Sequence, residues 1–155
     1  MKNIIIYSIL FSLLSECLVA QNQAVSQQAT TVKLSDLRWR DMCILPDQAT
    51  KTYYLVGPGG RGVRAYTSKD LINWTGPQMI YSAPQDVWGE IPIVSIWAPE
   101  MHFYNGKYYL FLTFDTRNKF SEQWRNWLPR VTRGSQVLVS DKPIGPFSSL
   151  SGLHA

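Results

Sequence analysis

The sequence has little cysteine, few charged residues and almost no helical periodicity. Two cysteines in 155 residues exclude a disulfide-rich scaffold. Charged residues make up 17% of the chain, and its lysines and arginines are scattered, which excludes a basic nucleic-acid-binding arm. We therefore expect no nucleic-acid partner. The hydrophobic fraction of 45% is large enough for a packed core and excludes a disordered chain.

The sequence also lacks the run of about 20 apolar residues that a membrane-spanning helix needs. Its start is short and basic over residues 1–3, its apolar run over residues 4–14 is brief, and Ala20 offers a small residue for cleavage. This pattern is typical of a secretory signal peptide, which we predict over residues 1–20. We expect a secreted or periplasmic protein without a membrane span. Cleavage would leave Cys43 alone, so no internal disulfide is expected.

Short apolar runs alternate with turn residues through most of the remaining chain. Residues 21–33, rich in Gln, Ala, Thr and Ser, are predicted to be a flexible leader. From there on, the clearest strand signals lie at residues 51–56, 62–67, 107–114 and 135–140. Asn105-Gly106 predicts a tight hairpin, because both residues accept a positive φ. Helical spacing is confined to residues 120–128, where a short helix and an aromatic loop both remain open. The predicted fold class is all-β.

The strand signals repeat. A tyrosine pair at Tyr53-Tyr54 returns 55 residues later at Tyr108-Tyr109, and an acidic residue precedes each pair, Asp41 in the first half and Glu100 in the second. A second strand follows each pair, ending in Ser-Lys-Asp or Ser-Asp before an aromatic residue. This period is typical of propeller-type arrays, whose blades must stack on one another to bury their faces.

Four stretches resemble glycoside hydrolase family 43, whose members are five-bladed β-propellers. In chain order they are residues 40–44, 66–74, 96–100 and 134–147. The resemblance covers the N-terminal part of the family's domain. It implies that residues 34–155 supply about the first two blades, and that C-terminal blades needed for a complete fold are missing from this chain.

The resemblance implies an exported, inverting glycosidase that acts on arabinofuranosyl, xylosyl or related units of plant or microbial polysaccharides. Inversion needs a general base and a general acid about 6.5–9.5 Å apart, so that water fits beside the sugar. By resemblance, Asp41 is the general base, and Glu100 orients the general acid and raises its pKa. Met42 follows Asp41 where the family usually has proline, and Glu100 stands where aspartate is common.

The general acid of the family is a glutamate in a later blade. Glu122 is the only glutamate after Glu100, and it matches no such motif. We therefore expect this chain alone to be inactive. Two alternatives remain open, a non-catalytic carbohydrate-binding propeller fragment and an inactive remnant, because a surface that only stacks on sugars needs no general acid.

Three further residues are candidates for substrate binding. Trp97 and Trp88 can line a sugar site, although Trp97 also fits a core position. His102 follows Glu100 by two residues and therefore shares its strand face, where it can position a sugar or serve a structural role. The sequence contains no cluster with metal-ligand spacing, no phosphate-binding glycine loop and no serine-elbow motif. We expect neither a metal nor a cofactor.

Overall fold

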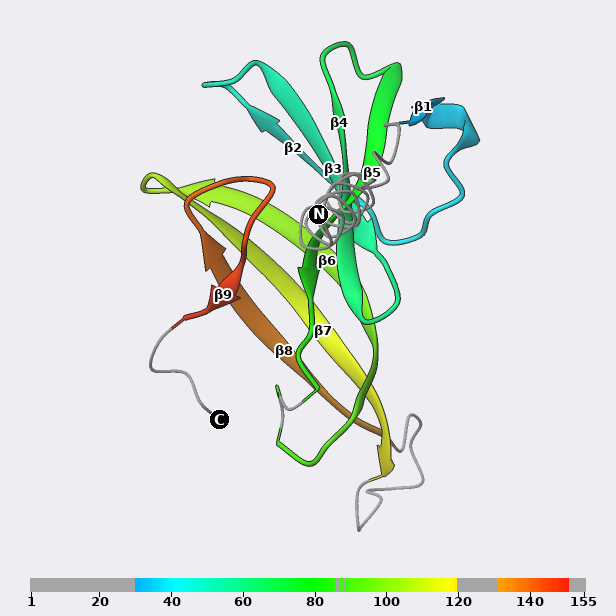
Figure 1. Ribbon diagram of the computed structural model, residues 1–155, viewed down its shortest axis with the longest axis vertical. Coiled ribbons are helices and arrows are strands. Elements are labelled where there is room, and N and C mark those ends of the chain that lie inside the picture. The colour runs from blue at the N-terminus through cyan, green and yellow to red at the C-terminus, as the bar shows by residue number, and fades with distance from the viewer. Residues whose placement is uncertain (1–29, 86, 88, 120–130, 151–155) are drawn as a thin grey trace, which may run out of the picture.

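The computed structural model describes residues 30–85, 87, 89–119 and 131–150, which form two antiparallel sheets (Figure 1). In the first sheet the strand order is β1-β5-β4-β3-β2. Its strands are β1 (Thr30–Lys33), β2 (Cys43–Asp47), β3 (Thr52–Pro58), β4 (Gly62–Ser68) and β5 (Asn73–Ser82), with the 3-10 turn η1 (Leu34–Asp36) after β1. The second sheet has the order β6-β7-β8-β9, with β6 (Ile93–Tyr104), β7 (Lys107–Lys119), β8 (Val131–Ser140) and β9 (Ser148–Ser149).

Each sheet contains a four-stranded meander, in which neighbours in sequence are neighbours in the sheet. This arrangement confirms the all-β class and the expectation of two successive propeller blades, since a blade is such a meander. The four clearest strand predictions correspond to β3, β4, β7 and β8, except that Lys51 lies in the turn before β3. The tight hairpin is also confirmed: Asn105 and Gly106 have φ values of 47° and 78° and join β6 to β7.

Some sequence predictions fall on residues that the structure does not describe. These are the signal peptide over residues 1–20, most of the leader over residues 21–33, and the aromatic segment over residues 120–128. The last four residues of the predicted leader are described, and they form strand β1, which pairs with β5 at the outer edge of the first sheet.

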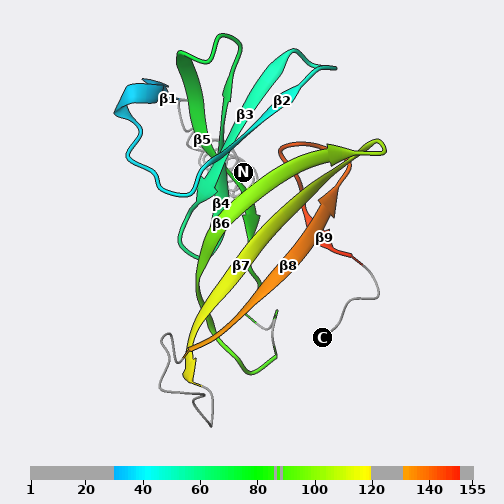
Figure 2. The ribbon, with the colours of Figure 1, turned by 180° about the vertical axis from the view of Figure 1, so that it is seen from behind.

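The core lies between the two sheets. Strand β6 is the strand of the second sheet nearest the first sheet, with β8 and β9 on the far side (Figure 2). The core contains Val56 and Val63 from the first sheet with Met101, Leu110 and Phe114 from the second, all of them almost fully buried. Burying large apolar side chains of this kind stabilises a fold by about 1.5–3 kcal/mol each relative to leaving them exposed.

Backbone and side-chain contacts also join the sheets. The amide of Ile96 donates to the carbonyl of Gly60 over 2.9 Å, and the Cys43 thiol lies 3.9 Å from the carbonyl oxygen of Met101. The beginning of β2 therefore lies beside the middle of β6. This proximity places the sequence-predicted residues around Asp41 next to the strand that carries the other candidates.

The tyrosine repeat corresponds to a repeat in register. Tyr53 pairs with Ser68 in the first sheet, and Tyr108 pairs with Ser140 in the second. In each blade the serine hydroxyl then accepts a hydrogen bond from a backbone amide of the following turn.

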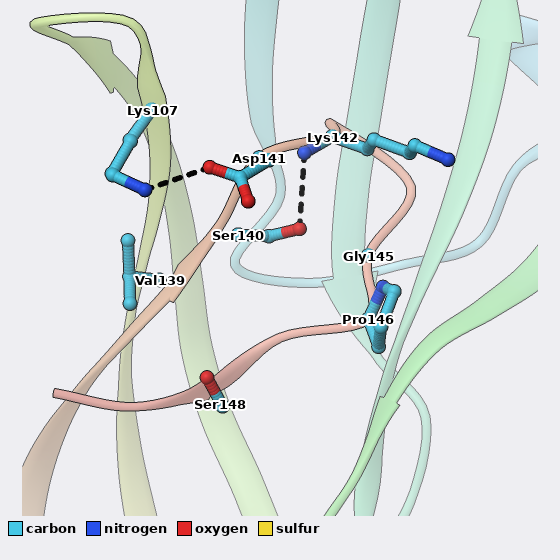
Figure 3. Close-up of a pocket in the computed structure, with 8 residues that line it drawn as sticks. All are labelled: Lys107, Val139, Ser140, Asp141, Lys142, Gly145, Pro146 and Ser148. Atoms are coloured by element: carbon cyan, nitrogen blue, oxygen red, sulfur yellow. Dashed lines mark hydrogen bonds and ion pairs between the residues drawn. The ribbon is translucent and has the colours of Figure 1, made fainter. Parts of the chain in front are cut away.

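Figure 3 shows the turn of the second blade, in which the Lys142 amide donates to Ser140 and the Lys107 ammonium donates to Asp141 over 2.7 Å. The turn encloses a shallow cavity of about 280 Å³ that is bordered by Gly145 and Pro146. The ion pair of Lys107 with Asp141 is exposed. Exposed pairs of this kind contribute at most about 1 kcal/mol to stability.

Candidate functional site

Strand β6 carries three of the sequence-predicted residues, and a β-bulge determines where they point. Trp97 pairs with Thr113 of β7, and Glu100 pairs with Phe111, so three steps along β6 face two along β7. The extra residue is Ala98, which has a φ of 44°. An odd spacing would place Trp97 and Glu100 on opposite faces of a regular strand. The bulge restores them to the same face, the one opposite the core.

That face of the second sheet forms an open groove of about 870 Å³. Residues of β6, β7 and β8 line it, and most of them are apolar or aromatic. The lining includes Glu100, His102, Tyr104, Phe111 and Val137. Phe111 is 44% exposed and Tyr104 is 73% exposed, so no described segment covers the groove.

Glu100 and His102 meet inside this groove. The Glu100 carboxylate lies 3.3 Å from Nε2 of His102, and both side chains are more than half exposed. The imidazole also packs edge-on against Phe111, with ring centroids 5.5 Å apart. The prediction that His102 shares a strand face with Glu100 is confirmed. The pair can act as a hydrogen bond or, when the histidine is protonated, as an ion pair.

Asp41 lies two residues before the start of β2, is exposed and has a φ of 54°. When the blades are aligned on their tyrosine pairs, Cys43 and Glu100 face equivalent positions of the neighbouring strand. Asp41 then corresponds to Ala98, which also has a positive φ, and not to Glu100. The sequence order had paired Asp41 with Glu100 as the acidic residue of each half. The register instead places Asp41 at the same blade position as the bulge beside Trp97.

The groove contains one of the two candidate catalytic carboxylates. Within the part of the chain that is described, the residues lining the groove include Glu100 and His102 but neither Asp41 nor Trp97. Trp88 lies outside the described residues, and its role in substrate binding stays a prediction.

Trp97 is held by a ring of contacts that the sequence reasoning missed. Its indole N–H donates to the Ser95 hydroxyl over 2.9 Å, and that hydroxyl lies 3.4 Å from the Asp115 carboxylate. Nε of Arg133 donates to the other oxygen of Asp115 over 2.6 Å. The guanidinium carbon of Arg133 lies 4.2 Å from the centre of the Trp97 ring, which closes the ring of contacts.

This network was hidden because its members are distant in sequence. Asp115 follows the apolar run of β7 and Arg133 precedes that of β8, so only the pairing of these strands brings them together. A polar residue at the end of each predicted strand was the available signal. Trp97 itself is 42% exposed, which contradicts a core role for it among the described residues.

A second polar cluster joins the two blades away from the groove. The hydroxyl of Tyr108 donates to the Asp47 carboxylate over 3.1 Å, and the hydroxyl of Thr50 and the amide of Ala49 donate to it as well. Burial by itself raises the pKa of Asp47, but these hydrogen bonds together outweigh it and lower the pKa. Burial and the bond to Asp47 raise the pKa of Tyr108 to about 12.

The described residues offer neither a metal cluster nor a membrane-spanning helix. They contain no group of three or more His, Cys, Asp and Glu side chains placed to hold a metal ion. Nor do these residues include a helix with the length and apolar character needed to cross a bilayer.

Comparisons with known proteins agree with this architecture. The family model described as "Glycosyl hydrolases family 43" matches residues 34–155. The extracellular endo-α-(1→5)-L-arabinanase 1 of Bacillus subtilis is 36% identical over 66 residues, which cover 39% of this chain and 20% of that protein.

Two solved structures of arabinan-cleaving enzymes are also similar to this chain. The endo-arabinase of Bacteroides thetaiotaomicron is 37% identical, with a TM-score of 0.61, over 80% of this chain and 38% of that one. An arabinanase of Bacillus subtilis shares the fold at 22% identity, with a TM-score of 0.51, over 69% of this chain and 34% of its own. The chain thus spans a fifth to two fifths of the length of these relatives. The matched family model and the two stacked blades show that the chain belongs to glycosyl hydrolase family 43.

Proposed function

We propose that the complete protein is an exported, inverting glycosidase that cleaves α-(1→5)-linked L-arabinofuranosyl chains internally. The family assignment and the names of the two arabinan-cleaving relatives support this substrate class. The observation that carries the proposal is the position of Asp41. An exposed carboxylate in the left-handed region begins the first blade, at the place that the bulge beside Trp97 occupies in the second.

Asp41 is proposed as the general base. Its side chain is exposed, so water can reach its carboxylate. Aspartate is among the few residues that adopt a positive φ without much strain, and residues held in that region cluster at functional sites. In the proposed step, Asp41 takes a proton from water as the water oxygen attacks the anomeric carbon. The general acid protonates the departing glycosidic oxygen, and the configuration inverts.

We propose that further blades cover the groove on the second sheet and supply the general acid. Exposed aromatic side chains such as Phe111 and Tyr104 are suited to burial under another sheet. Glu100 would then face the incoming segment, where its negative charge would raise the pKa of a neighbouring acid and keep it protonated. On this account the chain of 155 residues alone does not hydrolyse polysaccharide.

Trp97 is proposed to stack against a sugar ring, since an exposed indole offers a flat apolar surface for the C–H face of a sugar. His102 and Trp88 remain proposed substrate contacts. We also propose export through cleavage after Ala20, which the extracellular location of the Bacillus relative supports.

The catalytic assignment is tested by the rate at which the complete protein and its Asp41→Asn variant release reducing ends from linear arabinan. Loss of a general base should lower turnover by about 10²–10⁴-fold while leaving arabinan binding intact. Asp36→Asn is a matched control, because Asp36 is another exposed aspartate just upstream in η1. Wild-type turnover in Asp41→Asn would remove Asp41 from the mechanism.

A further inference from the structure

The ring formed by Ser95, Trp97, Asp115 and Arg133 restricts how Trp97 can meet a ligand. The indole N–H is already donated to Ser95, so it is not free to bind a sugar hydroxyl. The Arg133 guanidinium lies over the indole ring at 4.2 Å and therefore occupies one of its two faces. The exposed part of the side chain is left to contact a ligand only through its other face and its edge.

Asp115 fixes Arg133 in this position. The Asp115 carboxylate is the most buried charge of the ring, with 14% of its side chain exposed, and it receives Nε of Arg133 at 2.6 Å. It also lies within reach of the Ser95 hydroxyl that accepts from Trp97. The Asp115 carboxylate thus holds the Arg133 guanidinium above the indole and the Ser95 hydroxyl at the edge of the indole. The Trp97 side chain therefore has little rotational freedom left to lose on binding.

The charges of the ring also indicate the class of ligand. Arg133 is paired with Asp115, so the face that carries Trp97 presents a neutralised cation and not a free one. A free guanidinium beside an indole would suit the carboxylate of an acidic sugar. The neutralised pair suits an uncharged sugar that stacks on the indole.

We propose that Arg133 and Asp115 are positioning residues that hold Trp97 as a one-sided stacking surface for an uncharged sugar ring. The proposal rests on the proposed function, because it takes Trp97 to face the substrate. It deepens that function by assigning the residues that select a neutral sugar. Loosening the contacts of Arg133 and Asp115 should therefore weaken sugar binding and leave the hydrolytic reaction in place.

The test is the affinity of the complete protein for linear arabino-oligosaccharide, measured by calorimetry in an Asp41→Asn background, in which hydrolysis is slowed. Arg133→Met should raise Kd by roughly 2- to 10-fold, because binding must then pay to immobilise a freed indole. Arg133→Lys, which keeps a cation over the ring, should recover part of this loss. Lys107→Met breaks another ion pair between neighbouring segments of the same sheet and should leave Kd unchanged.

A double-variant cycle separates positioning from a general structural effect. In a Trp97→Ala background, Arg133→Met should have no further effect on Kd, since the residue through which Arg133 acts is gone. An equal loss of affinity with and without Trp97, or an unchanged Kd in Arg133→Met alone, would overturn the proposal.

A readout independent of sugar is the hydrogen exchange of the Trp97 indole proton by NMR, with the signal assigned through Trp97→Phe. Ser95→Ala should accelerate this exchange. An unchanged exchange rate would contradict the hydrogen bond from the Trp97 indole to Ser95. If the wild-type protein binds the oligosaccharide in an Arg133-dependent way but never hydrolyses it, the proposed reaction fails and this inference stands. If the wild-type protein hydrolyses arabinan while the Arg133→Met variant binds the oligosaccharide normally, the proposed reaction stands and this inference fails.

Discussion

Trp97 and Glu100 lie on the same face of the second sheet although they are an odd number of positions, three, apart along β6. The bulge at Ala98 produces this arrangement, and it leaves Pro99 and Met101 in the core. A strand without the bulge would bury either the tryptophan or the glutamate. The Trp-Ala-Pro-Glu stretch therefore presents two candidate site residues on one face of a single strand.

The bulge predicts opposite effects for two substitutions of Ala98. Glycine adopts a positive φ without the steric cost that alanine carries, so Ala98→Gly should stabilise the complete protein by about 1 kcal/mol. A β-branched residue is strongly disfavoured there, so Ala98→Val should destabilise it by about 2 kcal/mol. Urea unfolding measures both. Equal stability of the two variants would show that Ala98 does not hold this conformation.

The Asp47–Tyr108 contact predicts a stability profile with two limits. The lowered pKa of Asp47 means that its contribution is complete above its unfolded pKa, near 3.8, and is lost as the pH falls below that value. The raised pKa of Tyr108 sets the alkaline limit. The contribution of Tyr108 to the free energy of unfolding is complete below pH 10 and is lost as the pH rises from about 10 to about 12.

Tyr108→Phe tests this contact directly. It should cost about 1 kcal/mol at pH 7, because one donor to a buried carboxylate is lost while those from Thr50 and Ala49 remain. It should also flatten the decline in the free energy of unfolding between pH 10 and 12. A variant that keeps the full alkaline decline would place its origin at another group.

Glu100 is tested by the pH dependence of kcat/KM in the complete protein. If its charge raises the pKa of the general acid, Glu100→Gln should shift the alkaline limb of the profile to lower pH, because the acid then loses its proton earlier. Asp141→Asn removes an exposed carboxylate that lies outside the groove, in the turn after β8, and should leave the profile in place. An unshifted profile with a lowered Tm would make Glu100 a structural residue of the groove.

The uncovered groove predicts how the fragment behaves alone. Residues 21–155, expressed by themselves, should self-associate and lack a cooperative unfolding transition, since a large aromatic face stays exposed. Size-exclusion chromatography and thermal circular dichroism measure this. A monomer with a sharp melting transition would show that these two blades need no others.

Local patterns in the sequence were sufficient for β3, β4, β7 and β8, for the hairpin at Asn105-Gly106 and for the two-blade repeat, but not for β1, which lies in the predicted flexible leader. Each of these depends on residues that are close in sequence, such as a turn pair or an alternating run. The network around Trp97 could not be read in the same way. Asp115 and Arg133 meet only through the register of β7 and β8, which is a tertiary property.

The relationship between the two acidic residues depends on the strand register. In the first blade Cys43, and not Asp41, faces the position of β3 that corresponds to the one Glu100 faces on β7. The turn before β3 has four residues and the turn before β7 has two, so counting along the sequence does not reveal this correspondence. The structure was needed to align Asp41 with Ala98 and not with Glu100.

The most direct test of the account is the anomeric configuration of the first product released from linear α-(1→5)-arabinan by the complete protein, followed by proton NMR before mutarotation. A general base that activates water predicts that the new reducing end appears first as the β-anomer. Initial release of the α-anomer, or no release at all, would contradict the assignment of Asp41 as the base of an inverting arabinan hydrolase.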